Sequence, residues 1–207
     1  MSDTPHEREL VTFPRRDPLH IFILETFASA GRSPTLDEIQ SRFGLATATE
    51  AEARLETLES TGAIHRNPGD PAVTHAYPFS NERTAHRVRL AGGPEVFAMC
   101  AVDALGMPFM LGRDARIESQ CEDCKVTVRI ELHRGEMVGH APADTVVWLG
   151  EHAEGCVAAT DLCPDLNFFC SPGHLGHWRE QTGASGEQLS LEQALARGRR
   201  VFEHVMA

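Results

Sequence analysis

The sequence predicts an α+β protein in which a winged-helix-like helical module packs on a domain built around a mixed or antiparallel sheet. Helix start and stop signals recur through the first third of the chain, and alternating apolar residues mark strands after residue 83. A last helical pattern follows residue 190. Because strands precede this helix instead of alternating with helices, a regular βαβ arrangement is not expected. We expect residues 1–80 to form the module and residues 81–207 the sheet domain.

The composition is that of a globular protein. Its 207 residues, 42% of them hydrophobic, suffice for a sizeable core. No apolar run reaches membrane-spanning length and no signal-peptide apolar region is visible, so we expect a cytoplasmic protein without membrane contact. In that compartment the six cysteines are expected to be free or metal-binding thiols rather than disulfides. The net charge of −11 disfavours nonspecific binding to nucleic acid.

The first two expected helices begin at recognisable caps. Asp17 precedes Pro18 and can cap a helix that ends at Gly31, while Thr35 and Glu38 form a capping-box pattern that opens a second helix. Apolar residues at helical spacing predict the buried faces. In the three helices of the module these are Ile21, Leu24, Ala28, Leu36, Ile39, Phe43, Leu55 and Leu58.

A third helix and a wing complete the module. Thr47 and Glu50 repeat the capping-box pattern, and Gly62 is expected to stop this helix. The turn-rich segment 67–71 follows Ile64 and predicts a β-hairpin. This outline is that of a winged helix-turn-helix. The expected recognition helix carries four glutamates and one arginine between residues 47 and 61, so phosphate repulsion disfavours DNA as a partner and favours a packing role.

The second half alternates between apolar and polar residues as strands do. In the clearest example, Val126, Val128, Ile130 and Leu132 are expected to share one face. Other expected strands are 87–90, 115–119 and 145–149. A final helix is expected to open at Ser190 with Gln193, and Gly198 weakens it.

The candidate site starts from Cys100 and Asp103, which lie three residues apart in the apolar stretch 96–111. We expect a helix that starts near Pro94 and carries both side chains on one face, because residues at this spacing are neighbours on a helix. A second thiol, Cys163, lies in another mostly apolar stretch. Two thiols can bind a soft metal ion, and the carboxyl group can deliver a proton beside it.

Burial of this pair has a predictable effect on its protons. Burial disfavours the carboxylate form, so we expect it to raise the pKa of Asp103 and keep a proton available near neutral pH. The positive end of the helix favours the thiolate of Cys100. Because the two groups share one volume, their titrations are expected to be coupled.

The residues of this region also resemble a known family. The stretches 96–113 and 115–121, together with Cys163 followed by 167–169 and Ser171, look like the core of the alkylmercury lyases. The resemblance implies that Cys100 and Cys163 bind mercury, that Asp103 transfers the proton, and that the winged-helix-like region is structural. It implies an organomercurial substrate, no organic cofactor, and removal of Hg2+ by cellular thiols or a mercuric reductase.

The sequence departs from the family pattern at two positions. Met99 stands where many members have an aromatic residue, and Pro164 stands where many have a second cysteine. Neither change removes a reacting group. The alternative function is that of a non-enzymatic protein on the same scaffold, which would bind or sense a metal through its thiols.

The remaining cysteines leave several interpretations open. Cys121 and Cys124 form a Cys-x-x-Cys motif that can bind a metal with two further ligands, exchange disulfides, or be structural. Cys121 also matches a family position that looks structural. The other two cysteines, Cys156 and Cys170, are expected in the core. His174 and His177 are expected to be solvated, although they could assist a metal site.

Overall fold

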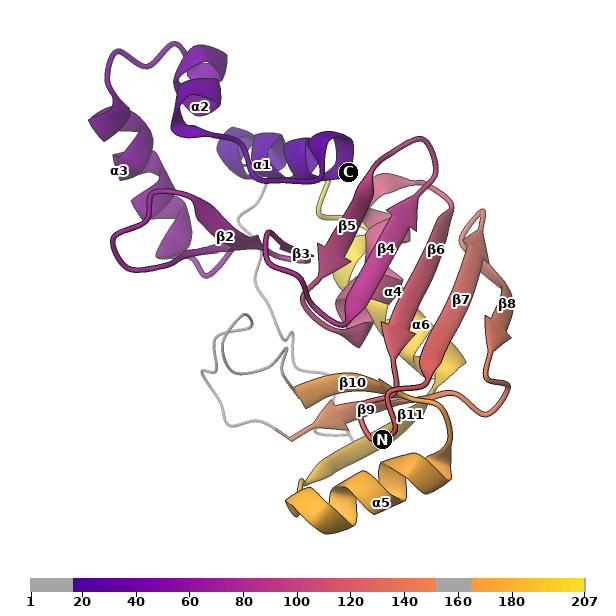
Figure 1. Cartoon of the computed structure of the whole chain (residues 1–207). Coiled ribbons are helices and arrows are strands. Elements are labelled where there is room, and N and C mark those ends of the chain that lie inside the picture. Colours follow the sequence, from indigo (N-terminus) through magenta and orange to yellow (C-terminus); the bar gives the residue numbers. More distant parts are fainter. Residues whose placement is uncertain (1–16, 152–164, 207) are drawn as a thin grey trace, which may run out of the picture.

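The computed structural model describes residues 17–151 and 165–206, and within these ranges the fold is α+β. Figure 1 shows three helices of the N-terminal module at one end, a large sheet with two helices on one face, and a small second sheet with a helix beside it. The helices are α1 Pro18–Ala30, α2 Leu36–Phe43, α3 Ala48–Glu59, α4 Ala101–Leu111, α5 Pro172–Thr182 and α6 Leu191–Phe202. In the described part of the chain, no helix is long and apolar enough to cross a membrane.

The predicted caps of the first two helices are confirmed. The side chain of Asp17 accepts hydrogen bonds from the first turn of α1, and Thr35 with Glu38 makes a complete capping box at α2. Five of the apolar positions expected inside the module are buried: Leu24, Ala28, Ile39, Leu55 and Leu58. Ile21 is only half-buried, and Ile23 on the same helix is fully buried in its place.

The start and end of α3 differ from the prediction. Thr47 accepts a hydrogen bond from the backbone N–H of Glu50, but the Glu50 carboxylate accepts from Ala46 and not from Thr47, so the capping box is incomplete. The helix ends at Glu59, before the expected stop at Gly62. Thr61 and Gly62 instead form a tight turn that leads into the wing.

The wing is part of the large sheet. Strands β1 Ile64–Arg66 and β2 Val73–Ala76 form the expected antiparallel hairpin, and β3 Phe79–Ser80 joins it to the rest. The eight strands run in the order β1-β2-β3-β5-β4-β6-β7-β8. The others are β4 His86–Leu90, β5 Glu95–Ala98, β6 Ala115–Gln120, β7 Thr127–His133 and β8 Glu136–Ala141. All pairings in this sheet are antiparallel. Of the two predicted sheet types, mixed and antiparallel, it is the antiparallel one.

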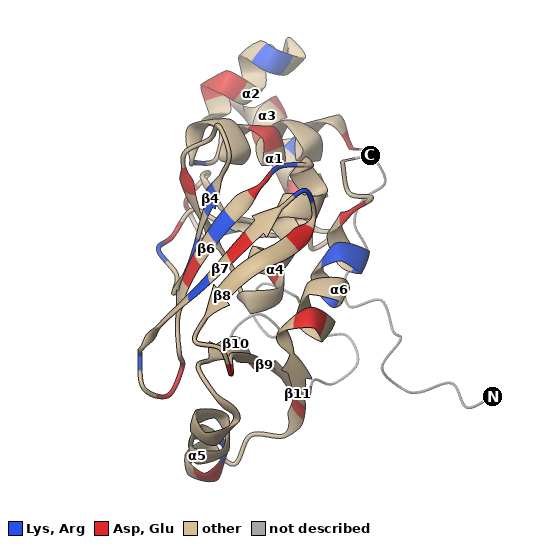
Figure 2. Cartoon of the chain, turned by 90° about the vertical axis from the view of Figure 1, so that its right-hand side faces the viewer, with Lys and Arg blue, Asp and Glu red and all other residues tan. Residues whose placement is uncertain are grey.

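The two faces of this sheet differ in polarity. Val88, Ile117 and Ile130 point from neighbouring strands into the core. The opposite face carries charges of both signs, visible across β4, β6 and β7 in Figure 2. There Glu118 pairs with Arg87 on one side and with Arg129 on the other, at 3.2 Å for the latter pair. Such exposed pairs add little stability, but they keep this face in water while the helices cover the other.

A second, three-stranded sheet lies below the first, in the order β10-β9-β11. Its strands are β9 Val146–Gly150, β10 Leu166–Phe169 and β11 Gly186–Ser190, all antiparallel. The helix α6 follows β11 directly and begins at the predicted capping box of Ser190 and Gln193. Its strand β10 lies against the end of β6.

Two predictions around the sheet are wrong. No helix starts near Pro94: residues 95–98 form β5, because an apolar run of this length fits a buried strand as well as a helix. Val126 does not share the buried face of β7; it lies in the turn before the strand and is 49% exposed.

Gly198 proves to be a packing residue of α6. A Cβ at this position would lie 2.9 Å from the carbonyl oxygen of Val102 and 3.0 Å from the backbone nitrogen of Gly106, both on α4. The two helices therefore approach closely where they cross the sheet. The glycine that weakens the helical pattern in sequence is what allows this contact.

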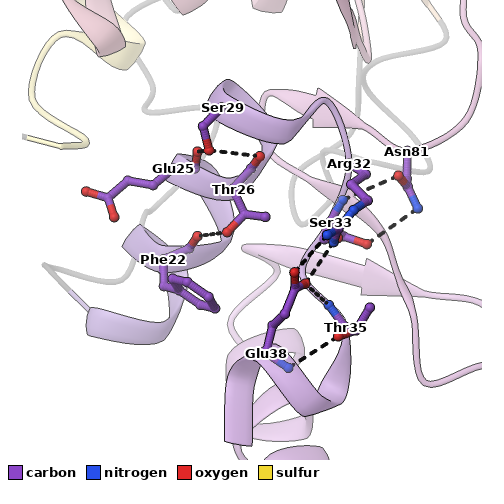
Figure 3. A network of polar contacts seen from close by, with 9 residues as sticks. All are labelled: Phe22, Glu25, Thr26, Ser29, Arg32, Ser33, Thr35, Glu38 and Asn81. Carbon is purple, nitrogen blue, oxygen red and sulfur yellow. Dashed lines mark hydrogen bonds and ion pairs between the residues drawn. The ribbon is translucent and has the colours of Figure 1, made fainter. Parts of the chain in front are cut away.

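Polar contacts tie the module to the sheet domain at the loop between α1 and α2 (Figure 3). Arg32 donates two hydrogen bonds to the Glu38 carboxylate, at 2.7 and 2.8 Å. The side chain of Asn81, directly after β3, accepts from the backbone N–H of Ser33 and contacts its hydroxyl group. The loop is thus fixed to both units.

Candidate functional site

Cys100 lies at the junction between β5 and α4. The strand ends at Ala98, and Cys100 is the N-cap residue of the helix. Its sulfur accepts a hydrogen bond from the backbone N–H of Asp103, with 3.4 Å between the sulfur and nitrogen atoms. Both side chains are completely buried, at 0% exposure.

The sequence predicted this proximity for a partly different reason. Cys100 and Asp103 are close because a capping side chain reaches the third residue of its helix, not because both lie on one helical face. A sulfur at this position faces the unsatisfied N–H groups and positive end of the helix. This location favours the thiolate more directly than a position inside the helix.

A cation on α6 interacts electrostatically with the thiol of Cys100. Burial lowers the pKa of Arg197, on α6, and the charge of Arg200 acts in the same direction, whereas Cys100 is among the groups that raise it. Arg197 is half-buried and nevertheless stays a cation at neutral pH, because its ordinary pKa is far above 7. The close packing of α6 on α4 therefore brings positive charge toward Cys100.

A buried histidine lies at the beginning of β4, opposite the end of β5. His86 pairs with Ala98 in the sheet, and its Nδ1 lies 2.8 Å from the hydroxyl oxygen of Ser119. Burial lowers its pKa to about 4, against a smaller opposing effect of its hydrogen bond with Asn167. His86 is thus a neutral imidazole on β4, the strand next to the one that leads to Cys100.

The third predicted site residue, Cys163, lies outside the described residues. Its convergence with Cys100 and Asp103 therefore stays a prediction. Closest to it in sequence, the strand β10 packs Phe168 and Phe169 into the core at 0% exposure.

A second group of sulfur and nitrogen atoms lies where the turn between β6 and β7 meets the start of α5. We call it the thiol–imidazole cluster. Its members are Cys121, Cys124, Cys170 and His174, whose ligand atoms all lie within 4.8 Å of one another. The sulfur atoms of Cys124 and Cys170 are 3.5 Å apart, and Cys170 Sγ lies 2.7 Å from His174 Nδ1. The three cysteines are free thiols.

The surroundings shift the pKa values of two thiols of this cluster in opposite directions. Burial, together with Cys124 and Cys121, raises the pKa of Cys170 to about 12. Burial opposes ionisation of Cys121 as well, but backbone N–H groups of Cys124, Cys170 and Asp123 outweigh it and lower the pKa of that thiol.

Sequence reasoning paired Cys121 with Cys124 and named His174 as a residue that could assist a metal site, but it did not join Cys170 and His174 to that pair. Cys170 was expected as a core residue and is 7% exposed, yet it also faces this cluster. His174 was expected to be solvated in a loop; it is half-buried on the first turn of α5. The spacing of four residues between Cys170 and His174 is the signal that could have identified both. His177 is exposed and pairs with Asp123, at 2.7 Å.

Comparison with known proteins finds relatives of the second part of the chain. The family model described as alkylmercury lyase matches residues 79–203. Curated alkylmercury lyases of Bacillus cereus and Staphylococcus epidermidis are 31% and 30% identical over 107 and 118 residues, which are 52% and 57% of this chain. The chain matches about half the length of these relatives, 49% and 54% respectively.

The fold and the N-terminal module have relatives too. A solved structure described as the mercury-bound form of MerB2 superposes with a TM-score of 0.75 at 23% identity, covering 95% of this chain and 94% of that one, which confirms the fold. The family model for the LexA DNA binding domain matches residues 14–72, in agreement with the winged-helix outline. Since the lyase family model spans more than half of the sequence, the chain belongs to the alkylmercury lyase family.

Proposed function

We propose that the protein is an organomercurial lyase that cleaves carbon–mercury bonds by protonolysis. The reaction converts R–Hg+ and a proton into the hydrocarbon RH and Hg2+. The electron pair of the carbon–mercury bond becomes the new carbon–hydrogen bond, so no oxidant, reductant or organic cofactor is required. The observation that carries the proposal is the buried contact of Cys100 with Asp103 at the N-terminus of α4.

Thiolates and an acid have separate tasks in this reaction. Cys100 and Cys163 bind mercury as soft ligands and donate electron density to it, which makes the attached carbon more basic. Asp103 transfers the proton to that carbon as a general acid. Burial keeps bulk water away from Cys100 and Asp103, so the electrostatic effects of the helix end and of Arg197 are weakly screened.

The product ion needs an acceptor. Hg2+ held by thiolates leaves by exchange with other thiols, so cellular thiols or a mercuric reductase are the proposed acceptors. The proposed site of action is the cytoplasm, where thiols stay reduced.

The direct test supplies the purified protein with methylmercury and excess thiol, and measures methane and Hg2+. We expect both products in equal amounts from the parent protein. Cys100→Ser should bind mercury more weakly while the helix stays capped, because a serine oxygen retains the helix cap but is a poor mercury ligand. A parent protein that binds methylmercury tightly but releases no methane would contradict the proposal.

A thiol-based metal sensor is the second candidate, since the module matches the LexA DNA binding domain. The charge of α3 argues against DNA contact: Glu50 and Glu56 are exposed and Arg54 is the one basic residue of the helix. Binding of the protein to a library of duplex DNA at physiological salt tests this candidate. Selective binding that changes with mercury would favour the sensor.

A further inference from the structure

The thiol–imidazole cluster contains a complete ligand set for a metal ion, and the proposed lyase reaction uses none of its members. Two ligands come from the turn after β6, and two come from the junction of β10 with α5. Around an ion with zinc–sulfur bonds of about 2.3 Å and tetrahedral angles, two sulfur atoms lie roughly 3.8 Å apart. The 3.5 Å between the sulfur atoms of Cys124 and Cys170 is close to that value, without a bond between them.

The backbone of the turn has the form of a metal-binding Cys-x-x-Cys loop. Lys125 donates a backbone hydrogen bond to the carbonyl oxygen of Cys121, at 2.9 Å, which closes the turn. The sulfur atoms of Cys121 and Cys124 lie within 4.8 Å of each other. Lys125 has a positive φ of 59°, which costs a non-glycine residue some strain. The chain is thus bent so that both cysteines of the motif face one point.

The second pair of ligands is fixed independently. Cys170 directly follows β10 and lies two residues before α5 begins, and His174 follows on the first turn of that helix, where Ser171 caps it. Glu122 donates a backbone hydrogen bond to the carbonyl oxygen of Phe168, at 3.0 Å, and so holds the turn against β10. The side chains therefore converge from two segments that a backbone hydrogen bond joins, as a preorganised metal site requires.

The charges around the cluster also suit a site with three thiolates. The two acidic residues inside the motif would repel thiolates, but each has a cationic or hydrogen-bonding partner: Glu122 pairs with Lys125 at 3.1 Å and Asp123 with His177 at 2.7 Å. The positive end of α5 points toward the same volume.

We propose that the thiol–imidazole cluster binds one Zn2+ ion as a structural site. Three sulfur ligands and one imidazole nitrogen form a common closed set for structural zinc, with no position left for a substrate. The donors are too soft for Mg2+ or Ca2+, which prefer oxygen. Binding releases the thiol protons to solvent and joins the turn between β6 and β7 to the start of α5.

The test uses the full chain, purified under reducing conditions from cells grown with zinc and without mercury. We expect about one zinc ion per chain by mass spectrometry of the metals, retained through dialysis. Cobalt added to the zinc-free protein should give the visible absorption of a tetrahedral, thiolate-bound ion. A strong chelator should lower the melting temperature of the parent protein. None of these readouts depends on carbon–mercury cleavage, so the result is independent of the proposed function.

Matched variants locate the ion. His174→Ala and Cys124→Ala should lose the bound zinc and the cobalt spectrum, whereas His133→Ala, which removes an exposed imidazole at the end of β7, should retain both. Circular dichroism checks that the variants are folded. Three outcomes would overturn the proposal: a zinc-free parent protein with all thiols reduced and no cobalt spectrum, zinc that His174→Ala and Cys124→Ala still hold, or a disulfide between Cys124 and Cys170 in place of the ion.

Discussion

Gly106 on α4 and Phe202 on α6 are in direct contact, and the aromatic ring occupies the space that a Cβ of residue 106 would need. A Cβ built there would lie 2.1 Å from Cδ2 of Phe202, which is fully buried. Because Gly106 has no side chain, α4, the helix that begins with Cys100 and Asp103, can pack closely on α6.

Gly106→Ala should destabilise the protein by roughly 1–3 kcal/mol, because overpacking against a buried ring outweighs the gain in helix propensity. Urea unfolding measures this free energy. Gly176→Ala on α5 is the control: a Cβ there meets nothing within 4 Å, so stability should rise by up to about 1 kcal/mol. If both variants were stabilised, the contact between Gly106 and Phe202 would not be as tight as described.

Asp103→Ala should separate mercury capture from cleavage. The variant retains the backbone N–H that contacts Cys100, so an organomercurial should still bind to the thiols. Methane release should fall at least roughly 100-fold, the typical cost of losing a positioned general acid. Mass spectrometry of bound mercury beside a methane assay measures both steps. Asp114→Ala, which removes a carboxylate that pairs with His133 near the surface, should leave turnover unchanged. Equal rates for Asp103→Ala and the parent protein would show that Asp103 is not the acid.

Arg197→Gln should make the thiol of Cys100 harder to ionise. Loss of this cation disfavours the thiolate, so the pH profile of thiolate formation at Cys100 should move to higher pH. The ultraviolet absorbance of the thiolate at a series of pH values, taken as the difference between each protein and its Cys100→Ser counterpart, follows this cysteine alone and needs no access to the buried sulfur. Arg200→Gln removes an exposed cation from the same helix and should shift the profile less. A profile that does not move, or moves to lower pH, would contradict an electrostatic role for Arg197.

Two buried histidines should make stability fall on acidification. Burial lowers the pKa of His86 to about 4, and burial, partly opposed by Asp17, lowers that of His20 to about 4. The unfolded chain, with ordinary pKa values near 6.5, then binds more protons than the folded one between about pH 6.5 and 4. Their contribution is therefore fully present above about pH 6.5 and is lost as the pH falls toward 4.

The variant His86→Gln isolates one of these residues. Between pH 7 and 5, its free energy of unfolding should fall by about 2 kcal/mol less than that of the parent protein, since glutamine does not titrate. Urea unfolding at both pH values gives the difference. An identical fall in the two proteins would mean that folding does not change the pKa of His86.

Local signals allowed much of the fold to be predicted. The caps at Asp17, Thr35 and Ser190 act within one turn, so spacing alone identifies them. The boundary between β5 and α4 was missed because residues 96–111 form one mostly apolar run, and periodicity does not separate a buried strand from a buried helix.

The site was predictable to a similar extent. Cys100 and Asp103 are close in sequence, and their contact is local. The thiol–imidazole cluster joins two segments more than forty residues apart, so the pairing of Cys121 with Cys170 depends on how β6 meets β10. Cys-x-x-Cys left a metal site as one of three interpretations, and the tertiary structure shows that Cys170 and His174 lie beside it.

The short strand β3 limits where the chain can be cut into fragments that fold by themselves. It pairs with β2 on one side and with β5 on the other, and the ring of Phe79 stacks on that of Phe27 at 5.2 Å. The boundary expected after residue 80 lies directly beyond it. A fragment that begins at residue 81 would leave β5 as an open edge, ready to pair with another chain and aggregate. Any exchange of the winged-helix-like module between relatives must therefore replace β3 with a strand of matching register.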